Sequence, residues 1–232
     1  MIKIAPSILA ADVLHLERDV RRVTEGGCDW LHVDIMDAHF VPNLSYSPTV
    51  VSRLKETFDV PLDVHLMMDE PEKWIDVFLH AGADVLTIHA ESAETAGTDP
   101  EAPLSEAAAV KLISLLKRIR GGGARAGIAI RPVTGLAKIL PLLPYADMVL
   151  TMTVEPGFGG QRLQEGVVDK IRALRESGYA GEIEADGGLT AENLPGLVRA
   201  GLSVAVMGTA IFGQQDPAAV LRRLRREGES RP

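Results

Sequence analysis

Residues 30–37 read WLHVDIMD, an apolar run that carries two polar side chains two residues apart. Side chains at positions i and i+2 of a β-strand project from the same face of the sheet. His32 and Asp34 therefore share one face, and the aliphatic residues around them occupy the other. Burying two such polar groups costs free energy unless they are paired or bound to something. The stretch predicts a strand that packs on helices with one face and carries a polar site on the other.

Runs of this kind recur along the 232 residues and alternate with helical patterns. The predicted strands are residues 2–9, 30–36, 61–68, 85–90, 124–131, 148–154, 181–186 and 204–207. Helices are expected at 47–57, 72–81, 105–120, 135–143, 166–177 and 217–227, with a short one at 210–212. Two more are expected after the N-cap candidates Asp12 and Thr190, ending at Gly26 and Gly201.

Eight sequential strand–helix units predict an α/β fold, the closed (β/α)8 TIM barrel. We expect one barrel domain over residues 1–232, with 228–232 as a frayed tail. An open, doubly wound sheet is the alternative, and it usually has a glycine-rich turn after its first strand. Here the first strand runs through residues 5–8, APSI, which contain no glycine. The pattern therefore favours the barrel.

The composition excludes several function classes. Lys and Arg number 24 against 32 Asp and Glu, and a net charge of −8 argues against a chain that holds nucleic acid by bulk charge. The single cysteine, Cys28, excludes an intramolecular disulfide and a cysteine-rich zinc module. No apolar run of the sequence reaches the roughly 18 residues of a membrane span, and the first residues lack a secretory pattern. We expect a cytoplasmic protein without nucleic-acid or membrane partners.

Polar residues at strand ends indicate a metal site, because the C-terminal ends of barrel strands carry function. His32 and Asp34 lie on the second predicted strand, His65 on the third and Asp186 at the end of the seventh. These nitrogen and oxygen ligands suit Zn²⁺, Mn²⁺, Fe²⁺ or Co²⁺. A lone His–x–Asp pair is more often a hydrogen-bonded core pair. The placement of all four residues at strand ends favours the metal interpretation.

Glycines after the last three strands indicate a phosphate site. Residues 157–160 read GFGG, residues 187–188 read GG, and Gly208-Thr209 precedes the short helix. Glycines let backbone N–H groups approach an anion, and phosphate sites after the last strands recur in barrels. One glycine pair is usually only a turn. Glycines in three successive late loops favour phosphate binding.

Six motifs together resemble the ribulose-phosphate 3-epimerase family. They are IAPSIL at 4–9, HVDIMD at 32–37, HFVPN at 39–43, DVHLM at 63–67, PGFGGQ at 156–161 and DGG at 186–188. They occur in order, and the resemblance covers nearly the whole chain. It implies a (β/α)8 barrel of the ribulose-phosphate-binding type that interconverts D-ribulose 5-phosphate and D-xylulose 5-phosphate in the pentose phosphate pathway.

The resemblance also implies roles for individual residues. A divalent metal, Zn, Fe, Mn or Co, is held by the positions matching His32, Asp34, His65 and Asp186. Asp34 and Asp186 match the acid–base pair, which transfers protons on opposite faces of a cis-enediolate. The matching substrate-binding positions are Ser7, His65, Gly157, Phe158, Gly159, Gly160, Gly187, Gly188, Gly208 and Thr209. Relatives form dimers or hexamers, so a homo-oligomer is expected.

The chain departs from the common family pattern in places. Ala38 stands where the family usually has Gly, and Arg131-Pro132 replaces Asn-Pro or Lys-Pro. Residues 45–48, SYSP, resemble the allulose-6-phosphate epimerases, whereas Gly188 resembles the pentose enzymes. An epimerase of allulose 6-phosphate or of a tetrulose phosphate therefore remains an alternative. The more remote alternatives are a non-catalytic phosphosugar-binding barrel and a metal-free indole- or thiamine-type barrel.

The remaining expectations concern smaller features. Met36, Met67 and Met152 end strands and are expected to line the site, with ordinary core packing as the alternative. The acidic segment 91–106 is expected to be a mobile loop that is longer than typical. Of the other histidines, His39 is expected to shape the site. His89 ends the fourth predicted strand and could face the mouth of the barrel, but it is not expected to touch the substrate. His15 and His80 are expected on the surface, and Cys28 in the core.

Overall fold

The computed structural model describes residues 2–94, 97–164 and 166–229. Within them, eight strands form one parallel sheet in the order β1-β8-β7-β6-β5-β4-β3-β2. The strands are β1 (Lys3–Pro6), β2 (Leu31–Met36), β3 (Leu62–Met67), β4 (Val85–His89), β5 (Arg125–Ile130), β6 (Met148–Met152), β7 (Glu182–Asp186) and β8 (Val204–Met207). An isolated parallel bridge between Ser7 and His32 joins the two edges, so the sheet curls into a nearly closed barrel. The predicted TIM barrel is confirmed.

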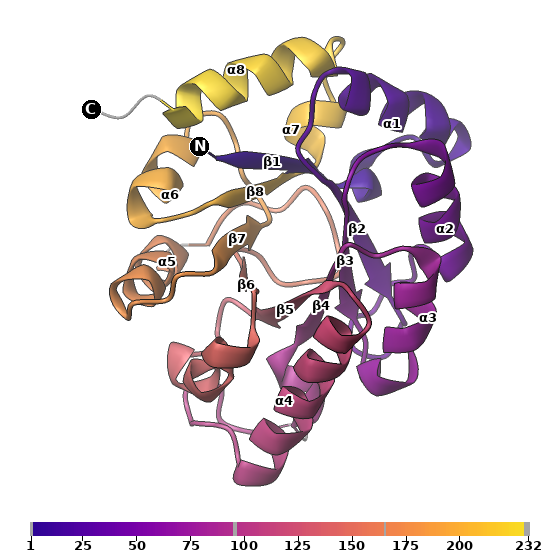
Figure 1. Ribbon diagram of the computed structural model, residues 1–232. Helices are drawn as coiled ribbons and strands as arrows, with labels where there is room; N and C mark the ends of the chain where they lie inside the picture. Colours follow the sequence, from indigo (N-terminus) through magenta and orange to yellow (C-terminus); the bar gives the residue numbers. More distant parts are fainter. Residues whose placement is uncertain (1, 95–96, 165, 230–232) are drawn as a thin grey trace.

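Helices surround this barrel (Figure 1). The α-helices are α1 (Leu16–Glu25), α2 (Pro48–Thr57), α3 (Ile75–Ala81), α4 (Glu106–Gly121), α5 (Val167–Glu176), α6 (Leu194–Ala200), α7 (Thr209–Phe212) and α8 (Pro217–Glu229). The described residues also form short 3-10 helices: η1 (Ile8–Ala10), η2 (Val13–His15), η3 (Pro71–Lys73), η4 (Ala90–Ala93), η5 (Leu136–Lys138) and η6 (Leu140–Tyr145). Among the described residues, no helix is long and apolar enough to cross a membrane.

Two layers of packing hold the strands. The outward residues Leu31, Val33 and Ile35 of β2 are buried in the main core with side chains of the surrounding helices. Inside the barrel, its N-terminal end is closed by an apolar cluster. That cluster consists of Ala5, Trp30, Val85, Met148, Val204 and Val206. Lys3, Arg125 and Glu182 lie at this end as well: both cations pair with Glu182 and lie over the ring of Trp30. Side chains therefore fill this end of the barrel.

Several predicted boundaries were wrong, each for a local reason. The expected helix at 135–143 is two 3-10 helices, since Pro141 and Pro144 lack the N–H groups that a continuous α-helix would need. The strand expected at 2–9 ends at Pro6, because Ser7 caps η1 and its Oγ accepts from Leu9 N at 3.3 Å. Asp12 caps η2 rather than α1.

The ends of the last helices also differ from the prediction. The N-cap of α6 is Asn193 rather than Thr190, whose Oγ1 lies 3.4 Å from the Asn193 backbone N–H. The helix predicted at 217–227 continues to Glu229. Residues 230–232 of the expected frayed tail lie outside the described residues. The single-domain organisation stays a prediction, although one sheet runs from Lys3 to Met207.

Ala38 provides a test of backbone strain in the loop after β2. It is the one non-glycine residue with positive φ (61°) among those described. The left-handed region costs L-residues about 1–2 kcal/mol, and glycine escapes this cost. We expect Ala38→Gly to raise the free energy of unfolding by about 0.5–1 kcal/mol in urea titrations. Ala107→Gly, in the exposed first turn of α4, should lower it by a similar amount. A lower free energy of unfolding in both variants would show that the backbone at Ala38 is not strained.

Candidate active site

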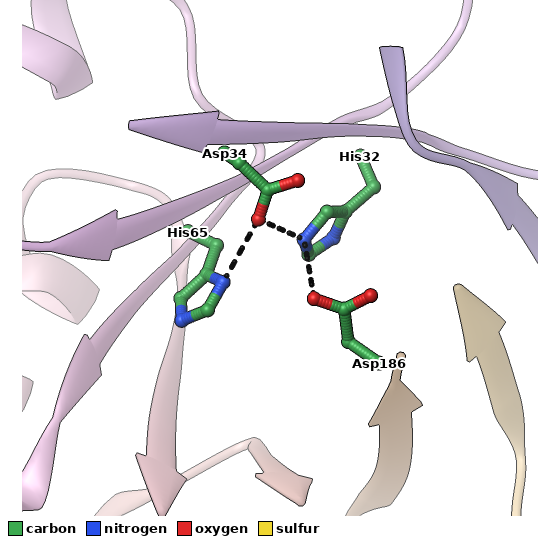
Figure 2. A group of neighbouring side chains, drawn as sticks. All are labelled: His32, Asp34, His65 and Asp186. Carbon is green, nitrogen blue, oxygen red and sulfur yellow. Dashed lines mark hydrogen bonds and ion pairs between the residues drawn. The ribbon is translucent and has the colours of Figure 1, made fainter. Parts of the chain in front are cut away.

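Four ionisable side chains converge inside the C-terminal half of the barrel (Figure 2). His32 and Asp34 come from β2, His65 from β3 and Asp186 from the end of β7. The register sets Asp34 beside His65 on the neighbouring strand. His32, Asp34 and His65 are buried, whereas Asp186 is partly exposed. The sheet thus brings together residues that lie up to 154 positions apart in the chain.

The distances in this cluster are short. Asp34 Oδ1 lies 3.2 Å from His32 Nε2 and 3.2 Å from His65 Nδ1. His32 Nε2 lies 3.9 Å from Asp186 Oδ2. One ligand atom from each of the four residues lies within 4.8 Å of all the others. Two imidazole nitrogens and two carboxylate oxygens in this arrangement could hold one divalent cation.

A second layer of side chains orients the first. His32 Nδ1 lies 2.6 Å from Asp63 Oδ2, and Glu184 Oε1 lies 3.9 Å from the same nitrogen. Since Asp63 holds Nδ1, the other nitrogen of His32 faces the cluster, as in metal sites that have a carboxylate behind a histidine ligand. Asp63, His32 and Glu184 are themselves close enough to hold a cation. We interpret Asp63 and Glu184 as side chains that orient His32 in the four-residue cluster, because His32 belongs to both groups.

Burial and neighbouring charges shift the pKa values of these groups in opposite directions. Burial disfavours the charged form of Asp34, but His32 and the hydrogen bonds from both histidines outweigh it and hold its pKa well below the usual range. Burial and the nearby charge of Asp34 raise the pKa of Asp186 from 3.8 to about 7. Burial lowers the pKa of His65 to about 4. The two carboxyl groups of the cluster therefore differ sharply in proton affinity.

A cavity of about 780 Å³ opens above the cluster. All the predicted site residues except His32 and His65 line it: Ser7, Asp34, Met36, Met67, Met152, Gly157, Phe158, Gly159, Gly160, Asp186, Gly187, Gly188, Gly208 and Thr209. His32 and His65 are fully buried below. Sequence reasoning missed Arg162, the one cationic side chain among the described residues that line the cavity. Its place beside the GFGG stretch could have suggested it.

The glycine loops fit closely around this cavity. Gly188 has φ 65°, and an added Cβ would lie 2.4 Å from the backbone nitrogen of Leu163. Only glycine therefore lets the chain after Asp186 pack against residues 161–163. Asn43 Nδ2 donates a hydrogen bond to Gly157 O at 2.7 Å, which joins the loop after β2 to the loop after β6.

Other residues singled out from the sequence lie elsewhere. His15, His39 and His80 are exposed, and His39 is not among the described residues that line the cavity. Cys28 is partly buried, and burial raises the pKa of its thiol to about 12, which argues against a nucleophilic role. His89 is fully buried and contacts His65 rather than the cavity.

The acidic segment 91–106 is anchored at its start. Glu91 accepts hydrogen bonds from Arg131 N at 2.8 Å and from Thr134 Oγ1 at 2.5 Å. Glu94 binds the buried Lys138 through both carboxylate oxygens, each at 2.8 Å. The expected mobility of this loop stays a prediction for the rest of it, and residues 95–96 lie outside the described residues.

Comparison with known proteins decides the family. The model of the ribulose-phosphate 3 epimerase family matches residues 3–212. The chain belongs to the ribulose-phosphate 3 epimerase family. It is 42% identical to "Ribulose-phosphate 3-epimerase" of Mycobacterium bovis, over 97% of this chain and 92% of that protein. The Bacillus subtilis protein of the same name is 38% identical, over 97% and 99%. As a member of this epimerase family, the chain is an enzyme of the isomerase class.

The family also includes a plant protein. "Ribulose-5-phosphate-3-epimerase, chloroplastic" of Arabidopsis thaliana is 40% identical, over 97% of this chain and 76% of that protein. Because relatives of one family occupy different compartments, a cytoplasmic location stays a prediction for this epimerase-family member.

Solved structures extend the likeness of the fold beyond the epimerase family. A 3-hexulose-6-phosphate synthase from Salmonella typhimurium superimposes with a TM-score of 0.70 at 16% identity, covering 97% of this chain and 98% of its own. A thiamine phosphate pyrophosphorylase from Pyrococcus furiosus gives 0.64 at 17% identity, covering 98% and 96%. These proteins share the barrel and show the fold alone.

The raised pKa of Asp186 predicts a pH-dependent stability of the metal-free protein. The folded state binds this proton more tightly than the unfolded state, so the group's contribution to stability is lost as pH rises from about 4 through about 7. An asparagine there cannot ionise. With chelator present, Asp186→Asn should gain stability relative to the unmodified protein between pH 5 and pH 8, by on the order of 1–3 kcal/mol. Urea unfolding across this range measures the difference.

Asp169→Asn is the matched control, because Asp169 is 77% exposed on α5. Its stability difference should stay constant over the same range. A constant difference for Asp186→Asn as well would show that Asp186 is already ionised at pH 5.

Proposed function

We propose that this protein is a metal-dependent 3-epimerase that interconverts D-ribulose 5-phosphate and D-xylulose 5-phosphate by two-base proton transfer, in the pentose phosphate pathway. One observation carries the proposal. Asp34 and Asp186, from strands that β1 and β8 separate in the barrel, both line the cavity and contribute to the same cluster of four ligands. Inversion at a carbon next to a ketone needs such a pair of proton-transferring groups.

The residues present fit a divalent cation. His32 Nε2, His65 Nδ1 and one oxygen each of Asp34 and Asp186 would hold it, and the second nitrogen of each histidine is occupied by another side chain. The chemistry that a cation supplies at such a site is Lewis-acid polarisation of a carbonyl oxygen, which makes the neighbouring C–H proton easier to remove. The donor set suits Zn, Fe, Mn or Co.

The chain's own carboxyl groups would move the proton. Asp34, whose pKa is held low, removes the C3 proton on one face of the sugar. The planar cis-enediolate then receives a proton from Asp186 on the other face, and the roles exchange in the reverse reaction. Ser7 Oγ donates a hydrogen bond to Asp34 Oδ2 at 2.8 Å and so fixes the orientation of that carboxylate. The buried side chains of Met36, Met67 and Met152 exclude water from the cavity floor.

The phosphate of the substrate would bind above the loops after β6, β7 and β8. Gly157–Gly160, Gly187, Gly188, Gly208 and Thr209 line that part of the cavity and match the phosphate cradle that the family resemblance implies. Phe158 is exposed on this loop, and Arg162 adds a positive charge beside it. Local positive charge offsets the net charge of −8 where the anionic substrate approaches.

A longer or shorter sugar phosphate is the alternative, suggested by the SYSP stretch at 45–48. The contacts of that stretch do not support this alternative. Ser45 Oγ donates to Asp34 O at 2.5 Å and accepts from Met36 N at 3.0 Å, and Tyr46 OH donates to Ile8 O at 2.9 Å. These side chains bind backbone and do not belong to the described lining of the cavity. Relative turnover of C4, C5 and C6 ketose phosphates decides the chain length.

Asp34→Asn and Asp186→Asn test the two-base scheme. Each should lower C3 epimerisation by about 10²–10⁴-fold, the usual contribution of a general acid or base. The measurement is turnover together with C3–H exchange in D₂O, at matched metal content. Asp169→Asn should keep full activity, since Asp169 lies on the outer surface. Turnover near that of the unmodified protein in either active-site variant would refute the scheme.

Metal removal is a separate test. Dialysis against a chelator should abolish C3–H exchange, and one equivalent of Zn²⁺, Mn²⁺, Fe²⁺ or Co²⁺ per chain should restore it, because the described residues form one four-ligand group at the cavity. Elemental analysis of the purified protein identifies the resident metal. Persistent exchange in protein that is verified to be free of metal would exclude a metal-dependent reaction.

The proposal includes a cytoplasmic homo-oligomer, dimer or hexamer, without nucleic-acid or membrane partners. Exposed apolar side chains on α3 and α4 support self-association, since Val77 is 41% and Val110 61% exposed. Sedimentation equilibrium distinguishes the two assemblies.

A further inference from the structure

A row of hydrogen-bonded side chains leads from His65 away from the cavity, through His89 to Glu91. Figure 2 shows one ring nitrogen of His65 facing Asp34 and the other turned away from it. That second nitrogen, Nε2, lies 2.9 Å from His89 Nε2. His89 Nδ1 in turn lies 3.0 Å from Glu91 Oε2. His65 and His89 are both fully buried, so water does not compete for these nitrogens.

The positions of the protons fix the donor and the acceptor of each hydrogen bond in this row of side chains. If His65 Nδ1 is to bind a cation, it carries no proton, and the proton of the neutral ring sits on Nε2. That N–H donates to His89 Nε2, which must then be the bare nitrogen of its own ring. The proton of His89 therefore sits on Nδ1 and is donated to Glu91. The last side chain of the row must therefore accept a hydrogen bond, and an ionised carboxylate can only accept.

Glu91 is held firmly in that role. Its other oxygen, Oε1, accepts from Arg131 N at 2.8 Å and from Thr134 Oγ1 at 2.5 Å. These hydrogen bonds and the one from His89 outweigh its burial and lower its pKa to about 2, so the carboxylate is ionised at neutral pH. Its side chain is 15% exposed. Glu91, on the 3-10 helix η4, is therefore a charged acceptor held by hydrogen bonds from His89, Arg131 and Thr134.

Ring contacts also hold His89, the middle member of this row of side chains. The ring of His89 stacks on His65 with centroids 5.0 Å apart and contacts Phe40 at 4.7 Å. The guanidinium of Arg131 lies over the ring of Phe40, 4.4 Å from the ring centroid. The ring of His89 is thus confined on more than one side, and its rotation would break both hydrogen bonds.

We propose that His89 and Glu91 are positioning residues for the metal site, which hold His65 in the tautomer and orientation that present Nδ1 to a divalent cation. This inference rests on the metal dependence in the proposed function and deepens it. Neither residue is a metal ligand, and neither belongs to the described lining of the large cavity. Side chains that orient a ligand histidine typically contribute 10–100-fold to metal affinity.

The test measures metal binding directly. Zn²⁺ affinity is determined by competition with a chelating dye, and the absorption spectrum of bound Co²⁺ reports the ligand geometry. Glu91→Gln and His89→Phe should each weaken Zn²⁺ binding by about 10–100-fold and change the Co²⁺ spectrum. His89→Gln should recover most of the affinity, because its amide oxygen can accept from His65 and its amide nitrogen can donate to Glu91.

Thr134→Val separates positioning from general support of the loop. It removes one hydrogen bond from Glu91 but leaves the contact between Glu91 and His89. It should bind Zn²⁺ within about threefold of the unmodified protein. Zn²⁺ affinity within that margin in both Glu91→Gln and His89→Phe would overturn the proposal, and so would an equal loss in Thr134→Val or in His89→Gln.

The same experiments keep the two proposals apart. If the unmodified protein binds Zn²⁺ and exchanges C3–H while Glu91→Gln and His89→Phe bind the metal unchanged, the positioning inference fails and the proposed function stands. If the unmodified protein binds Zn²⁺ without C3–H exchange while these variants bind it more weakly, the proposed reaction fails and the positioning inference stands.

Discussion

Asp34 Oδ1 lies 3.2 Å from a nitrogen of His32 and 3.2 Å from a nitrogen of His65, in the interior of a barrel whose other end is filled with side chains. Ionisable groups in such surroundings lose their hydration, and only partners of opposite charge or hydrogen-bonding character offset that loss. This constraint explains the polar layers around the cluster. Asp63 lies behind His32, and His89 behind His65. The same demand for partners makes the cluster a suitable place for a cation.

The two ends of the barrel differ: the N-terminal end is filled with side chains, and the C-terminal end carries the cavity. Apolar side chains, together with the ion pairs of Glu182, fill the N-terminal end. Strands β3 to β8 are each hydrogen-bonded to two neighbouring strands. The C-terminal end carries the cavity and its glycine-rich loops. At Gly188 a side chain would collide with the backbone of Leu163, so the loop can close over the carboxylates only without one. Paired strands and closely packed loops would hold Asp34 and Asp186, the proposed acid–base residues, with the precision that proton transfer needs.

The barrel itself says little about chemistry, since a synthase and a pyrophosphorylase at 16–17% identity superimpose on it. What distinguishes this chain is which inward positions are polar. Asp34 and Asp186 differ in proton affinity because Asp34 is stabilised by two histidines and itself acts on Asp186 as a like charge. Two carboxyl groups with separated pKa values, in a group of side chains that could hold a cation, support the two-base reaction proposed above.

Local pattern was enough to predict much of this molecule. The period of two along residues 30–37 placed His32 and Asp34 on one face, and the alternation of eight strands with helices predicted the barrel, because both follow from neighbours in the chain. The late glycines and the methionines of the cavity were found by their position at or after strand ends. Ser7 was indicated only by the family resemblance, and Arg162 was missed. Local pattern failed where a nearby residue breaks a regular element, as Pro141 and Pro144 do in η6. Only the tertiary structure connected His65 to His89 and Glu91, since strand register and the path of the loop after β4 decide which nitrogens meet. The helical and strand periods carry no information about contacts between elements. The candidate metal ligands could therefore be read from the sequence, whereas the side chains that lie behind them follow from the fold.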